Sequence, residues 1–170
     1  MAKAHHKGQP TRIRRNVQQY GDPYIPKLNQ GELAVCTRCH ALYQRRHWFF
    51  DEELFNRSAA LQNTRQVVCP ACQKIGDNYP EGEVILRGVF LDTHRAEIMN
   101  LVSNEEERAK GLNPLERIVR ITEGNSALTI TTTNEKLAQR IGRALQKAYQ
   151  GNVSYRWSED TKYAHVEWVR

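Results

Sequence analysis

Apolar and polar positions follow regular patterns along the second half of the chain, beginning near residue 83. The segment 83–91, EVILRGVFL, is apolar and rich in β-branched residues, which is typical of a buried strand. Segment 116–122 also has a strand pattern, and segment 127–133, ALTITTT, alternates cleanly. Glu-Gly-Asn at 123–125 is a turn signal between them. These patterns predict three strands, the last two joined by a tight turn.

Two segments of the same region have helical patterns. Asp92 or Thr93 could cap a helix that runs to about Arg108, and Asn134 is expected to cap a second helix that Gly151 ends. Apolar residues of the second helix recur on one face, as in an amphipathic helix. The expected inner positions are Ala96, Met99, Leu101 and Val102 in the first helix, and Leu137, Ile141, Ala144, Leu145 and Ala148 in the second.

Two further strands, 153–157 and 163–169, are expected to close the chain as a hairpin. The resulting order is β-α-β-β-α-β plus one extra strand. This order predicts an α+β fold, with a ferredoxin-like domain over residues 83–170 whose antiparallel sheet carries helices on one face. The fold alone does not decide a function. An RNA-recognition motif would carry stacking aromatics on its third strand, and 127–133 has none.

Aromatic residues gather on this last predicted hairpin. We interpret them as core and edge packing, with a protein or RNA contact surface as the alternative. The residues are Tyr155, Trp157, Tyr163 and Trp168.

Charge separates the first part of the chain from the rest. The net charge is +6, and residues 1–35 hold six Lys/Arg against two acids, while residues 36–72 hold five against three. The remaining residues hold fourteen of each, so the excess positive charge lies in the first 72 residues. A basic front on a neutral back favours a polyanionic partner, with nucleic acid the first candidate. Residues 1–30 have little apolar periodicity, and we predict a basic, flexible arm there.

The four cysteines form the most specific motif. Cys36 and Cys39 in CTRC and Cys69 and Cys72 in CPAC give the spacing C-x2-C-x29-C-x2-C. Four thiolates suit one tetrahedral zinc ion, with no position left for a substrate. We therefore predict a structural zinc ribbon over residues 31–78. Disulfides are disfavoured in an intracellular chain, and the spacings match neither common iron–sulfur pattern.

Other residues near the cysteines leave alternatives open. His40 or His47 could replace one thiolate, although contact with phosphate or packing fits them better. Trp48 in QRRHWFF is expected to pack in the small core of the ribbon, whereas Tyr20 and Tyr24 could stack on bases or pack the arm. Basic residues of the arm and the ribbon are the candidates for binding RNA phosphates. They are Lys3, Lys7, Arg12, Arg14, Arg15, Arg38, Arg45 and Arg46.

Over about residues 30–120, the CTRC and CPAC pairs around a basic aromatic stretch, followed by a ferredoxin-like pattern, resemble a group of small bacterial zinc-ribbon proteins of poorly defined function. The paired cysteines are also similar to the zinc-binding front of the archaeal and eukaryotic adaptor for export of the large ribosomal subunit. That adaptor has eight zinc-binding cysteines, whereas this chain has four. The resemblance implies association with the ribosome or ribosomal RNA, and carries over only the four cysteines, as zinc ligands.

These observations predict a zinc-ribbon RNA-binding protein, associated with the ribosome through rRNA and in contact with ribosomal proteins, in hibernation or assembly. The alternatives are a transcription-related or protein-adaptor zinc ribbon, and a metal-dependent or redox enzyme. No P-loop, dinucleotide fingerprint or nucleophile elbow is present, so we expect neither an enzyme nor a small-molecule substrate. The first residues lack the apolar core of a secretory signal, and no apolar run approaches the ~20 residues of a membrane span. We expect a soluble, cytoplasmic protein.

Overall fold

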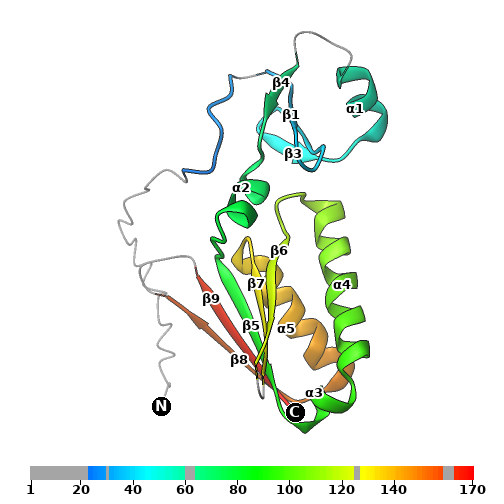
Figure 1. Cartoon of the computed structure of the whole chain (residues 1–170), viewed down its shortest axis with the longest axis vertical. Helices are drawn as coiled ribbons and strands as arrows, with labels where there is room; N and C mark the ends of the chain where they lie inside the picture. Colours follow the sequence, from blue (N-terminus) through cyan, green and yellow to red (C-terminus); the bar gives the residue numbers. More distant parts are fainter. Residues whose placement is uncertain (1–22, 30, 60–63, 125–126, 159–162) are drawn as a thin grey trace, which may run out of the picture.

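The computed structural model describes residues 23–29, 31–59, 64–124, 127–158 and 163–170. The protein is a mixed α+β structure with two sheets, which confirms the predicted fold class at this level. A small sheet and a short helix form one end, and a larger sheet with two long helices forms the other (Figure 1). No helix within these ranges is long and apolar enough to cross a membrane. Most of the predicted basic arm, residues 1–22, lies outside the described residues.

Four three-residue strands form the front sheet, in the order β3-β2-β1-β4. Neighbouring strands are antiparallel except β1 and β4, which are parallel. Helix α1 lies between β3 and β4 in the chain, and helix α2 follows β4 and leads to the back of the molecule (Figure 1). The elements are β1 (Ala34–Cys36), β2 (Leu42–Gln44), β3 (His47–Phe49), α1 (Glu52–Ala59), β4 (Arg65–Val67) and α2 (Pro70–Gly76).

Five six-residue strands form the back sheet, in the order β6-β7-β5-β9-β8. Helices α4 and α5 cover one of its faces, and the short helix α3 follows β5. The elements are β5 (Gly82–Arg87), α3 (Val89–Thr93), α4 (Arg95–Leu112), β6 (Ile118–Glu123), β7 (Ala127–Thr132), α5 (Glu135–Tyr149), β8 (Asn152–Trp157) and β9 (Ala164–Val169).

The back sheet differs from the expected antiparallel plan at β9. This strand pairs parallel with β5 on one side and antiparallel with β8 on the other. The last hairpin therefore folds back into the sheet, and β8 lies at the edge. Burial accounts for this choice, because every second residue of β9 is buried, whereas β8 has no buried residue. The extra strand in the sequence is thus an internal strand of the sheet.

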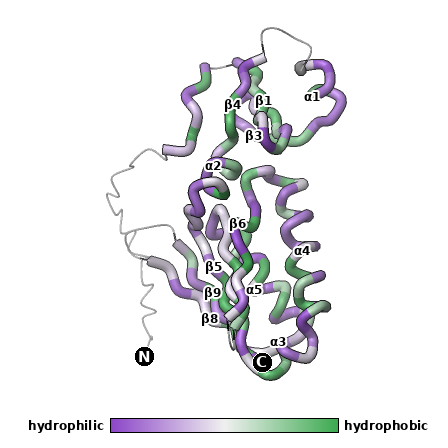
Figure 2. Tube along the Cα trace, in the orientation of Figure 1, coloured by the Kyte–Doolittle hydropathy of each residue, from purple (hydrophilic) through white to green (hydrophobic). Residues whose placement is uncertain are grey.

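Apolar residues from β5, β7, β9, α4 and α5 form one core between the helices and the sheet. Helix α5 begins as predicted, because the side chain of Asn134 accepts a hydrogen bond from the amide of Leu137 at 3.1 Å. Its residues Leu137, Ile141 and Leu145 are buried against the sheet, whereas Ala148 is exposed. Hydrophilic and hydrophobic residues alternate along α4, as its half-exposed position requires (Figure 2).

The segment between β5 and α4 corrects two predictions. The strand expected over 83–91 ends at Arg87, because Gly88 turns the chain with a φ of 109°. A Cβ at this position would meet the carbonyl oxygen of Arg170, so only glycine fits here. Helix α4 then begins at Arg95 rather than near Asp92. Of its predicted inner positions, Val102 is buried and Met99 and Leu101 pack against the core, whereas Ala96 is exposed.

Candidate metal centre

Cys36 is the last residue of strand β1, and Cys39 lies on the tight turn that follows. The amide of His40 donates to the carbonyl of Cys36 at 3.0 Å, and the amide of Cys36 donates to the carbonyl of Ala41 at 2.8 Å. His40 has a left-handed backbone with a φ of 63°, which returns the chain towards β2. Both cysteines of the first pair thus lie on one closed loop, as predicted from the two-residue spacing.

Cys69 and Cys72 lie at the beginning of helix α2, where a second ribbon turn was expected. Cys69 is the N-cap, and its Sγ accepts a hydrogen bond from the amide of Cys72 at 3.4 Å. Pro70 occupies the first helical turn, where its missing N–H costs no intrahelical hydrogen bond. The CPAC motif is therefore a helix start as well as a pair of ligands.

The two pairs come together as a single cluster. The four Sγ atoms lie within 4.8 Å of one another, and those of Cys39 and Cys69 are 3.6 Å apart. Metal–sulfur bonds of about 2.3 Å at tetrahedral angles require sulfur–sulfur distances of about 3.8 Å. Cys36, Cys69 and Cys72 are buried, and Cys39 is partly exposed. The four cysteines are thus placed to bind one metal ion, as predicted.

The four thiols are close enough to shift one another's pKa values in opposite directions. Hydrogen bonding with Cys39 is the main cause that lowers the pKa of Cys36 far below the ordinary thiol range. Contacts with Cys36 are the main cause that raises the pKa of both Cys69 and Cys72. Four neighbouring thiols cannot all ionise alone, because each thiolate opposes the next. A divalent cation removes this opposition, so the cluster has the chemistry of a metal site.

Donors around the cluster direct N–H groups at the sulfur atoms. The amide of Cys69 donates to Sγ of Cys36 at 3.3 Å, and a guanidinium nitrogen of Arg117 donates to Sγ of Cys72 at 3.4 Å. Arg117 comes from the segment between α4 and β6, far from the cysteines in sequence. Such outer donors fix the ligands and spread the thiolate charge. Sequence reasoning missed Arg117, because nothing in its local pattern distinguishes it from a surface arginine.

A small apolar cluster packs against the cysteines. Ala41, Trp48 and Ala71 are buried in it, and Leu115 from the back half packs on it. Trp48 is 6% exposed and lies 5.2 Å from Tyr43 between ring centroids, so it packs as expected. Arg117 and Leu115 both precede β6, so the same segment of the back half contacts the metal centre twice.

The predicted RNA-binding residues are only partly described. Lys3, Lys7, Arg12, Arg14 and Arg15 lie outside the described residues. Arg38 lies on the first cysteine turn and donates to the carbonyl of Cys72 at 3.1 Å. Arg45 and Arg46 form the two-residue tip of the β2–β3 hairpin and are exposed. Within the described part of the chain, neither of these two arginines forms an ion pair.

The backbone at this tip is unusual. Arg45 and Arg46 both have left-handed backbones, with φ of 52° and 67°. A two-residue hairpin with a type I′ turn needs this conformation at both positions, and Asn-Gly is a favoured pair because it adopts the conformation easily. Two arginines here are costly, by roughly 1–3 kcal/mol each for a residue in a sparsely populated conformation. Strained residues of this kind cluster at functional sites, so the two arginine side chains are candidates for a functional role.

The two histidines near the cysteines take other roles. The ring of His40 stacks on Phe55 with centroids 4.4 Å apart, and the ring of His47 stacks on Phe49 at 6.4 Å. Among the residues that the structure describes, the metal cluster consists of the four cysteines. Both histidines are exposed, each beside an aromatic ring, and neither takes the place of a thiolate in this cluster.

The fold and the cluster define an α+β protein in which four cysteines, at the junction of its two halves, are placed to bind a metal ion. Searches against protein-family models, curated proteins and solved structures find no match for the chain. The resemblance to small bacterial zinc-ribbon proteins stays a prediction.

Proposed function

We propose that this chain is an RNA-binding protein associated with the ribosome, whose four cysteines hold one structural zinc ion. The observation that carries the proposal is the pair Arg45 and Arg46. Both are exposed and unpaired among the described residues, and both are held in a costly conformation at the tip of a hairpin beside the metal centre. Guanidinium groups suit phosphate oxygens because they donate two parallel hydrogen bonds.

Zinc is the ion that this donor set favours. Four thiolates at tetrahedral spacing are typical of structural zinc sites, and four protein ligands leave no open position for catalysis. Bound zinc would supply positive charge that holds the four thiolates ionised. The residues of the chain do the rest: the cysteine turn positions Arg38, and the hairpin that packs through Trp48 positions Arg45 and Arg46.

The remaining parts of the chain extend the same proposal. Lys3, Lys7, Arg12, Arg14 and Arg15 would add phosphate contacts ahead of the metal centre, since the net charge of +6 lies in the first 72 residues. The back sheet would be a ferredoxin-like plan enlarged by β9, and would dock on ribosomal protein or on a folded RNA shape. The protein would act in the cytoplasm, in ribosome hibernation or assembly.

Salt dependence of binding tests the proposal directly. Affinity of the full chain for purified ribosomes and for rRNA is measured at salt concentrations from ~50 to 200 mM. Several phosphate contacts should cost roughly a thousand-fold in affinity over this range. The double variant Arg45→Asn, Arg46→Asn introduces a residue type that tolerates the left-handed conformation. It should lower the slope of log affinity against log salt concentration by about two. Arg156→Asn, an exposed arginine on β8, is the control. A shallow salt slope for the unmodified chain would refute phosphate-led binding.

One observation favours a second candidate function, a protein adaptor. Trp157 is 55% exposed on the edge strand β8 and stacks on Tyr155 with ring centroids 6.2 Å apart. An edge strand with an exposed aromatic residue can pair with a partner protein. A tagged pull-down with and without RNase separates the two functions. Loss of ribosomal subunits after RNase supports RNA binding, whereas retention of the partner after RNase and after deletion of residues 1–20 supports the adaptor.

A further inference from the structure

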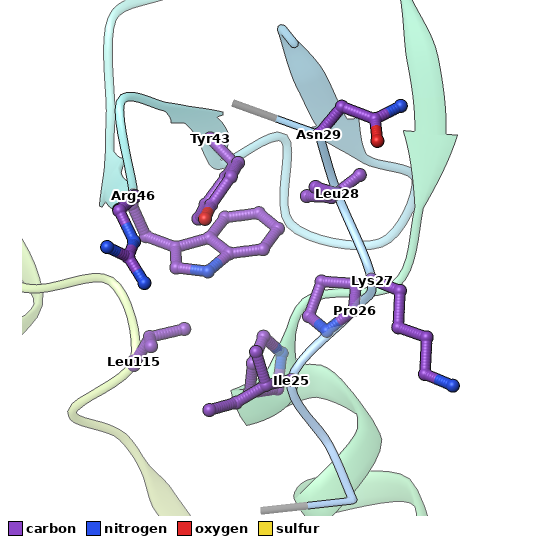
Figure 3. A pocket seen from close by; sticks show the side chains of 10 residues that line it. Ile25, Pro26, Lys27, Leu28, Asn29, Tyr43, Arg46 and Leu115 are labelled. Carbon is purple, nitrogen blue, oxygen red and sulfur yellow. The ribbon is translucent and has the colours of Figure 1, made fainter. Parts of the chain in front are cut away.

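A cavity of about 670 Å³ lies between the front sheet and the extended segment that precedes it. Four separate parts of the chain line it: the extended segment 25–29, the β2–β3 hairpin, the beginning of α2 and the segment before β6. Figure 3 shows Tyr43 and Arg46 on one side of the cavity and Pro26 and Lys27 on the other. The lining residues that carry the argument are Ile25, Tyr43, Arg46, Trp48 and Leu115.

The lining combines aromatic rings, aliphatic side chains and positive charge. Tyr43 and Trp48 lie directly opposite each other on β2 and β3, with their rings inclined by 53°. None of the described residues that line the cavity is acidic, and two are cationic. The ammonium group of Lys27 points away from the cavity in Figure 3, whereas the guanidinium of Arg46 lies beside it. The charge of the site is therefore suited to an anion attached to a flat apolar group.

We propose that this cavity takes one unstacked nucleotide of single-stranded RNA, with its base on the ring of Tyr43 beside the largely buried Trp48 and its phosphate on the guanidinium of Arg46. The inference rests on the proposed RNA-binding function and adds a site to it. Its volume lies within the range of roughly 300–1,000 Å³ that is usual for small-molecule sites. Bases of single strands stack on aromatic side chains, whereas bases in a duplex are covered by their neighbours.

The two arginines of the hairpin tip differ in their position relative to the cavity. Arg46 lines the cavity, whereas Arg45, its neighbour in the same turn, does not. Arg45 is then free to contact a phosphate outside the cavity, and Arg46 serves the nucleotide inside it. Both residues have a left-handed backbone in the same two-residue turn. The two arginines therefore form a matched pair for mutation, since they share turn, charge and exposure.

The test uses the full chain and two probes, a single-stranded RNA of about twelve nucleotides and mixed sequence, and the duplex of the same sequence. All variants carry Trp157→Phe. The remaining tryptophans are then Trp48 at the cavity and Trp168, which is completely buried and should not respond to RNA. Tryptophan emission and the dissociation constant are recorded for Tyr43→Leu, Arg46→Asn and the control Arg45→Asn. Metal content and circular dichroism verify that each variant is folded.

Single-stranded RNA should quench Trp48, and the duplex should not. Loss of one stacked base corresponds to about a five- to 150-fold change in affinity, so Tyr43→Leu should weaken single-strand binding within this range and leave the duplex unchanged. Arg46→Asn should weaken single-strand binding more than Arg45→Asn does. Equal effects of Tyr43→Leu on both probes, or unchanged Trp48 emission with the single strand bound, would overturn the inference.

The two proposals fail in different ways. If the unmodified chain binds neither probe with a steep salt dependence, the proposed function itself is wrong. If it binds both probes but the Tyr43 and Arg46 variants behave as the Arg45 control does, only the nucleotide site is wrong. Quenching of Trp48 by an acidic peptide that RNA cannot displace would also overturn the nucleotide site, because it would assign the cavity to a protein partner.

Discussion

The two halves of the molecule are stabilised by different means. The back sheet has six-residue strands, two long helices and a continuous apolar core of completely buried side chains. The front sheet has three-residue strands, and three of the six buried residues in its cluster are cysteines that belong to the metal site. The back half therefore has a core of hydrocarbon, whereas three of the nine buried hydrophobic residues described between Ala34 and Cys72 are cysteines. Where a core is this small, ligand atoms take the place of packed side chains.

Size explains the difference. A segment of about 40 residues buries too little apolar surface to fold alone, and usually needs a metal, a disulfide or a partner. Structural zinc contributes about 10–16 kcal/mol of binding free energy, which becomes folding free energy when the site forms only on folding. The back half needs no such contribution, because helices α4 and α5 bury one face of a five-stranded sheet.

The largest expected effect is loss of the metal. Chelation, or Cys69→Ser, should unfold residues 31–76 while the back sheet keeps its structure, because only the front half depends on the four sulfur atoms. Hydrogen exchange of the two sheets, measured with and without chelator, checks this. Thr37→Ser, on the exposed part of the first cysteine turn, is the control and should exchange as the unmodified chain does. Loss of protection in both sheets at once would contradict the comparison.

The next effect lies in the back core. Leu145→Ala removes a fully buried side chain from α5, and should lower the free energy of unfolding of the back half by about 2–5 kcal/mol. Bound metal should stay unchanged, because Leu145 does not pack against the cysteines. Thermal unfolding and metal analysis measure the two quantities. Leu112→Ala, at a leucine that is 71% exposed, should change stability little. A parallel loss of metal in Leu145→Ala would show that the two halves fold as one unit.

Sequence patterns predicted the parts of the molecule that are determined locally. The helix cap at Asn134 and the shared position of the two cysteines in each pair depend on neighbouring residues, and the structure has both features. The insertion of β9 beside β5 could not be predicted, because alternation assigns a buried face and not a neighbour. The donation from Arg117 to Cys72 depends on how the halves pack, which no local signal records. Both missed features depend on contacts between segments that are far apart in the sequence.

A variant of Arg117 measures how much the back half contributes to metal affinity. Arg117→Gln removes the guanidinium donor from Sγ of Cys72, and loss of an outer-shell partner typically weakens metal affinity by about 10–100-fold. Competition with a chelator of known affinity measures the change. The control is Arg120→Gln, an exposed arginine on β6. If both variants hold metal equally well, the contact of Arg117 with Cys72 contributes nothing to metal affinity.

The smallest expected effect is a difference between the two halves in how their stability depends on pH. Burial, with a smaller contribution from Glu83, raises the pKa of Tyr163 to about 12, so the folded back half favours the neutral phenol. This stabilisation is complete below the ordinary tyrosine pKa of about 10 and is lost as the pH rises through about 12. Tyr163→Phe should remove that alkaline loss, whereas Tyr79→Phe, at an exposed tyrosine, should not.

The stability of the front half should show the opposite pH dependence, because protons compete with the metal ion for the thiolates and acid releases the metal. Unfolding followed from acid to alkali in the same sample should therefore lose the front half at one extreme and the back half at the other. Coincident loss of both sheets at either extreme would mean that the contacts of Leu115 and Arg117 bind the halves into one cooperative unit.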